Sequence, residues 1–153
     1  MALILSGDTG VPASGMPTGS VIQVVQATYA TQTAYSSTTF TNTGLSVSIT
    51  PISTTNKILI YTNLMGVYTN TTSNFLKQRI TRNGTSIVDF DHIAGYSSQS
   101  ASSGSNTAFV YLDSPATISS ISYVLQASST SGAGINWCND GVTSTITVME
   151  IKA

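Results

Sequence analysis

The chain has 153 residues, which is enough for one domain with a buried core. Only 7% of them are charged, against roughly 25% in an average soluble domain. The net charge is −1, so the basic surface that nucleic acids and anionic membranes require is missing, and we exclude both as partners.

Residues 1–20 begin with a short apolar run, Ala2 to Leu5, and continue with glycine, proline, serine and threonine. A secretion signal needs a basic start and an apolar core of about 7–15 residues. A membrane span needs about 20 apolar residues. Because the run is too short for either and no basic residue precedes Lys57, we expect an extended N-terminal arm with an apolar tip and no membrane insertion.

From Val21 onwards the chain is rich in residues that favour strands, and no segment has helical apolar spacing. The pattern predicts strands at 21–29, 45–50, 56–68 with a bend at Gly66, 75–82, 85–90, 107–115, 121–129 and 145–151. This number of short strands separated by turns predicts an all-β fold, an antiparallel β-sandwich or jelly roll spanning residues 21–153.

The clearest local signal is Asn83-Gly84, which predicts a hairpin with a type I′ turn. The simplest register sets Ile80 opposite Ile87. It also sets Gln78 opposite Asp89, a poor pair for a core. Either the register differs from this one, or that end of the hairpin lies at the surface or at a contact between subunits.

Two predicted strands, residues 21–25 and 57–61, are apolar on both faces. A single sandwich core can bury one face of each strand only. The serine- and threonine-rich surface carries too little charge to keep a monomer well separated from its copies. We therefore expect self-assembly through the additional apolar surface.

Two long loops, at 91–106 and 129–144, are candidates for function. Each contains an aromatic residue, Tyr96 in the first and Trp137 in the second. Exposed rings on loops bind partners, including the apolar faces of sugars. The alternative for Trp137 is that it caps the core beneath its loop.

Residues able to carry catalysis are few. Asp89, Asp91 and His92 could hold a divalent metal, or they could mark only a strand that runs into a polar loop. Nothing favours Asp89 and Asp140 as a glycosidase pair. The single cysteine, Cys138, is expected to be a small buried hydrophobe. We predict no catalytic residues, no resident metal and no cofactor.

Three segments together resemble a known group of proteins. They are "MALILSGDTGVPASGMPTGSVIQVVQ", "DSPAT…SYVLQA" and "GVTSTITVMEIKA". The chain resembles small structural proteins of tailed phages, notably cyanophages, which include tail-fibre-like and other virion proteins. The resemblance implies a jelly-roll head, assembled as a homotrimer at the virion surface, and an arm over residues 1–20 that binds other virion proteins.

Carried over to this chain, the resemblance makes Leu3, Ile4 and Leu5 the docking tip and residues 7–19 a flexible spacer. The loops with Tyr96 and Trp137 would face the host and contact a surface glycan. The expected function is a fibre or receptor-binding head. The alternatives are a capsid decoration protein, of the cement or knob type, and, less favoured, an enzyme that degrades polysaccharide. The absence of a long shaft between arm and head keeps the decoration role open.

Overall fold

The computed structural model describes residues 12–69, 74–94 and 103–153, with the backbone alone at 91–94 and 103. These residues form strands β1 Val21–Tyr29, β2 Thr33–Tyr35, β3 Thr41–Ile49, β4 Lys57–Thr69, β5 Leu76–Arg82, β6 Thr85–Ala94, β7 Ser103–Asp113, β8 Ile121–Ser129, β9 Ile135–Trp137 and β10 Ser144–Ile151. Two short 3₁₀ helices, η1 Ala13–Gly15 and η2 Asn139–Gly141, complete the described part.

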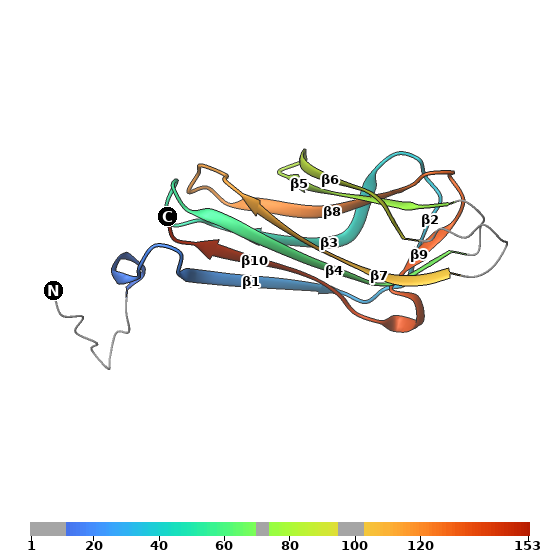
Figure 1. The fold of residues 1–153 in the computed structure, drawn as a ribbon, viewed down its shortest axis with the longest axis horizontal. Coiled ribbons are helices and arrows are strands. Elements are labelled where there is room, and N and C mark those ends of the chain that lie inside the picture. The colour runs from blue at the N-terminus through green and yellow to red at the C-terminus, as the bar shows by residue number, and fades with distance from the viewer. Residues whose placement is uncertain (1–11, 70–73, 95–102) are drawn as a thin grey trace.

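The strands form two antiparallel sheets that pack face to face, as Figure 1 shows. The larger sheet has the order β1-β10-β4-β9-β2, and β7 pairs with β4 on the side of β4 opposite to β10. The smaller sheet has the order β3-β8-β5-β6. The prediction of an all-β antiparallel sandwich is confirmed.

The core lies between the sheets and follows from the alternation of apolar residues along the strands. Leu45, Val47 and Ile49 on β3 are buried, and the serines between them are exposed. Ile58 and Ile60 on β4 are fully buried from the opposite sheet. Burying one such aliphatic side chain contributes about 1.5–3 kcal/mol.

The strands predicted at 21–29 and 121–129 have the expected bounds. The loop predicted at 91–106 was too long, because β6 continues to Ala94 and β7 begins at Ser103. The loop predicted at 129–144 contains the short strand β9, which pairs with β2 and β4. Strands of three residues such as β2 and β9 leave too short a pattern to detect in sequence, and their partners are distant in the chain.

The type I′ turn is confirmed, because both Asn83 (φ 49°) and Gly84 (φ 85°) are left-handed. The simple register is wrong. A bulge in β6 shifts the pairing, so that Ile80 pairs with Val88 and Gln78 with Phe90. The bulge resolves the poor pairing of Gln78 with an aspartate, because Asp89 is now exposed on the outer face beside Arg79.

The bend predicted at Gly66 is also confirmed. The register of β4 against β7 shifts between Leu64 and Val67, and Gly66 has φ 62°. A Cβ at this position would lie 2.6 Å from Val142 Cγ2 and 2.8 Å from the backbone nitrogen of Asn139. Glycine is therefore required here both for its backbone conformation and for the space that it leaves.

Two carboxylates buried at one end of the sandwich, on either side of Ile58, accept hydrogen bonds. The fully buried Glu150 accepts hydrogen bonds at Oε1 from the Ile52 backbone nitrogen (2.8 Å) and from Asn56 Nδ2 (2.7 Å). Asp113 accepts from Arg82 Nη1 (2.9 Å) and from the hydroxyl of the buried Tyr123 (2.7 Å). These bonds offset the cost of removing the two carboxylates, which lie at the ends of β10 and β7, from water.

Candidate functional site

The outer face of the larger sheet carries an apolar surface across four neighbouring strands. Met149 on β10 pairs with Val24 on β1 and with Leu59 on β4, and Leu59 pairs with Leu112 on β7. Since residues directly opposite in antiparallel strands share a face, these four side chains form one row. The exposed fractions of Val24 (57%) and Leu112 (47%) at its two ends show that the row faces outward.

A second row adjoins the first on the same face. Tyr61 on β4 pairs with Val110 on β7, two residues along from Leu59 and Leu112. The exposed fractions are 42% for Tyr61 and 58% for Val110. We call the six residues of these two rows the outer apolar face: Val24, Leu59, Tyr61, Val110, Leu112 and Met149. An apolar group of this kind on a sheet surface is typical of a protein–protein contact.

The outer face of the smaller sheet is polar by contrast. Arg79 donates from Nε to Gln126 Oε1 (2.7 Å), and its guanidinium carbon lies 4.3 Å from the centre of the Phe40 ring. On the neighbouring strand β3, Ser46 and Ser48 are exposed. The outer face of the smaller sheet is therefore suited to water, whereas the outer face of the larger sheet carries the apolar group beside the polar pair Gln26 and Thr147.

The base of the N-terminal arm is bound to the last strand. The Gly19 nitrogen donates to the Lys152 carbonyl (2.8 Å), and the Lys152 nitrogen donates to Ser20 (2.9 Å). Lys152 Nζ also donates to the carbonyl oxygens of Ser14 (2.9 Å) and Met16. The prediction of a flexible spacer over residues 7–19 is therefore wrong for residues 14–19, because hydrogen bonds hold this segment against the domain. Figure 1 places η1 and the C-terminus at the same end of the sandwich.

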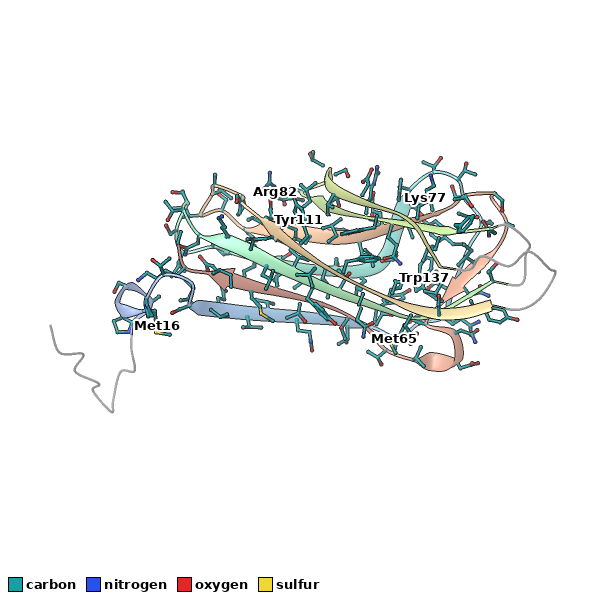
Figure 2. The ribbon with its side chains drawn as sticks, in the orientation of Figure 1. Met16, Met65, Lys77, Arg82, Tyr111 and Trp137 are labelled. Atoms are coloured by element: carbon teal, nitrogen blue, oxygen red, sulfur yellow. The ribbon has the colours of Figure 1, made fainter. Side chains whose placement is uncertain are left out.

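A pocket of about 410 Å³ lies towards the opposite end, where β4 bends at Gly66. β4 contributes Met65 and Tyr68 to its wall, β7 contributes Asn106, and the segment around η2 contributes Asn139, Asp140 and Val142. We call it the Gly66 pocket. Figure 2 shows Met65 beside this segment.

Hydrogen bonds from the bend hold the three walls of the Gly66 pocket together. The Gly66 nitrogen donates to Asn106 Oδ1 (2.9 Å) on β7. The Met65 carbonyl accepts from the Cys138 nitrogen (2.9 Å), and the Met65 nitrogen donates to Ser144 Oγ (2.9 Å). These bonds connect β4 at its bend to β7 and to the segments before and after η2.

The η2 segment has an unusual backbone. Cys138 (φ 51°) and Asp140 (φ 60°) are left-handed, a conformation that few residues other than glycine adopt. Such conformations persist only where surrounding contacts impose them, and they are concentrated at functional sites. Cys138 itself is buried, as predicted, and its Sγ lies 3.2 Å from Ser144 Oγ.

Trp137 is fully buried, so the expectation that its ring contacts a host glycan is wrong for this structure. Its indole packs against Tyr35, with ring centres 4.9 Å apart, and caps the core beneath the loop (Figure 2). The alternative interpretation, a core residue, is confirmed. The reason is that β9 places Trp137 on the inner side of the sheet, which a loop assignment could not reveal.

The structure describes only some of the other residues that the sequence suggested for docking, host contact or metal binding. Leu3, Ile4, Leu5 and Tyr96 lie outside the described residues. Asp91 and His92 lie on β6, but their side chains also fall outside the described part. Asp89 accepts from Ser86 Oγ (2.7 Å) at the surface. Among the side chains that the structure describes, no three histidine, cysteine or acidic residues come together to hold a metal.

Sequence reasoning missed the buried pair of Tyr123 and Asp113, because the two residues come from strands in different sheets. Burial raises the pKa of the Tyr123 hydroxyl, and its hydrogen bond to Asp113 raises the pKa further. Burial also raises the pKa of Tyr35. Both tyrosine side chains lie in the core and not in an open site.

No protein-family model matches this chain. The curated proteins likewise contain no match. Within the described residues, no helix has the length and apolarity needed to cross a membrane.

Proposed function

We propose that this protein is a non-enzymatic structural protein of a tailed-phage virion. It acts as a fibre or receptor-binding head at the virion surface, assembles as a homotrimer, and docks to other virion proteins through the arm at residues 1–20. The trimer and the virion location rest on the resemblance of the sequence. The self-assembly rests on physical features of the domain.

The outer apolar face is the observation that carries the proposal. Four strands contribute to it. The outer face of the smaller sheet is polar, so exposed apolar residues are not a general feature of both sheets of this chain. Exposed apolar side chains gain about 25 cal/mol per Å² when a partner covers them. Closed cyclic symmetry is the usual arrangement when the partner is another copy.

The positions of the two ends support a docking role. The bonds of Lys152 to residues 14–20 hold the base of the arm at the end of the domain where β10 ends. The Gly66 pocket lies towards the other end. A head that attaches at one end and contacts a receptor at the other needs this separation.

The native mass of the full chain and of a chain lacking residues 1–10, measured by light scattering, tests the proposal. We expect both chains to have three times the mass of one chain, because the outer apolar face belongs to the β domain. Monomers from both would overturn the assembly. A monomer from the shortened chain alone would mean that the arm holds the copies together, and capsid decoration would replace the fibre role.

Incorporation into particles tests the docking arm separately. The chain lacking residues 1–10 retains every described strand, so it should fold and yet be absent from assembled particles. Normal incorporation of the shortened chain would overturn the role of Leu3, Ile4 and Leu5 as the docking tip.

A further inference from the structure

The Gly66 pocket presents polar groups whose hydrogen-bonding capacity is not used within the described part of the chain. Asn106 uses Oδ1 to accept from Gly66, which leaves both hydrogens of its Nδ2 for another partner. Asp140 is exposed and accepts from Asn139 Nδ2 at Oδ2, so its carboxylate can accept from a ligand as well.

An amide donor and a carboxylate acceptor in the wall of one pocket match a particular chemistry. A hydroxyl group both donates and accepts, so two neighbouring hydroxyls on a ring can accept from Asn106 and donate to Asp140. Hydrogen bonds to a charged group are worth more than those between neutral groups, so Asp140 contributes most to the recognition.

Another part of the wall is apolar. Met65 and Val142 line the pocket together with Tyr68, which supplies an aromatic ring. Sugar rings have an apolar face of C–H groups as well as a rim of hydroxyls, and aromatic and aliphatic side chains cover such faces. The volume of about 410 Å³ lies in the range of small-ligand sites, about 300–1,000 Å³.

The charge of the pocket limits the ligand further. Asp140 is the one charged residue among the described residues that line it. A carboxylate on the ligand would be repelled by Asp140 and would find no lysine or arginine in this wall. We therefore expect the pocket to prefer neutral sugars over sialic and uronic acids.

We propose that the Gly66 pocket binds one ring of a neutral saccharide, with Asn106 donating to and Asp140 accepting from its hydroxyls. The inference deepens the receptor-binding part of the proposed function and rests on it for its biological meaning. It replaces Trp137 as the contact expected from the sequence, because that ring lies within the core.

Calorimetric titration of the full-length protein tests the site without any phage particle. The probes are the methyl glycosides of glucose, galactose, mannose and N-acetylglucosamine, with glucuronate as the anionic comparison. We expect at least one neutral glycoside to bind and glucuronate not to bind.

Two variants locate the binding. Asp140→Asn removes the carboxylate and keeps a residue that tolerates the left-handed backbone. Asn106→Asp keeps the Oδ1 acceptor for Gly66 and removes the Nδ2 donors. Each should weaken binding by roughly tenfold. Asp89→Asn removes the same charge from the exposed surface of the smaller sheet and should leave binding unchanged.

Three results would overturn the site: no binding of any neutral glycoside, binding of glucuronate alone, or binding that both Asp140→Asn and Asn106→Asp leave intact. A protein that forms trimers but binds no glycoside would overturn the saccharide site and leave the assembly proposal standing. A monomer that binds a glycoside through Asp140 would overturn the assembly proposal and leave the saccharide site standing.

Discussion

Tyr61 and Val110 pair across β4 and β7 on the outer side of the larger sheet, and more than 40% of each side chain is exposed. Both strands are buried on their inner side, where Ile60 and Thr62 flank Tyr61. The pair therefore lies on a sheet whose inner face already fills the core. What covers its outer face decides the oligomeric state of the protein.

Val110→Glu should convert the proposed homotrimer to a monomer. A carboxylate at this position would be enclosed by the apolar row of the partner copy, and an unpaired charge in an interface costs several kcal/mol. Light scattering measures the mass, and a thermal melt verifies folding. Ser48→Glu, on the exposed face of the smaller sheet, is the matched control and should leave the oligomer intact. An unchanged mass for Val110→Glu would show that the copies do not meet through this face.

Gly66→Ala should destabilise the domain far more than Gly84→Ala, although both glycines are left-handed (φ 62° and 85°). At Gly84 a new Cβ has no atom within 4 Å, so only backbone strain of roughly 1–2 kcal/mol is expected. At Gly66 the Cβ collides with Val142 and Asn139, and the loss should be roughly 2–5 kcal/mol. Urea unfolding measures both. Equal losses of unfolding free energy would mean that the η2 segment moves away from the added methyl group at little energetic cost.

The fluorescence of the single tryptophan should be insensitive to iodide in the native protein and strongly quenched after unfolding. Trp137 has no exposed surface and packs against Tyr35, so a charged quencher cannot reach the indole. Free tryptophan amide is the control for the quencher. Strong quenching of the native protein would place the ring at the surface and restore its interpretation as a contact residue.

The free energy of unfolding should fall as the pH rises above about 10, the ordinary pKa of tyrosine. Burial and the bond to Asp113 raise the pKa of Tyr123, so the folded state keeps a proton that the unfolded chain releases. More protons are then bound in the folded state, and stability decreases with pH. Tyr35 acts in the same direction.

Tyr123→Phe identifies the source of this pH dependence. The variant should be less stable at neutral pH by about 1–3 kcal/mol, because buried Asp113 loses a donor. Its further loss between about pH 9 and about pH 11 should be smaller than that of the wild type. Urea unfolding at the two pH values measures the difference. Equal losses in both proteins would show that Tyr123 does not control the effect.

The sequence by itself determined the features that depend on neighbouring residues. Alternation along 45–50 and 121–129 predicted the strands, Asn83-Gly84 predicted the turn, and Gly66 predicted the bend, because each is set by local backbone geometry. The composition also predicted the all-β class and the additional apolar surface on the strand at 57–61.

Only the tertiary structure decided what lies on which face and what meets at a site. The bulge in β6 places Asp89 on the outer face of its sheet, and strand β9 places Trp137 in the core. Asn106 and Asp140 meet at one pocket from distant parts of the chain. Strand pairing between distant segments sets each of these positions, and the same alternation of residues fits several pairings equally well until the core selects one.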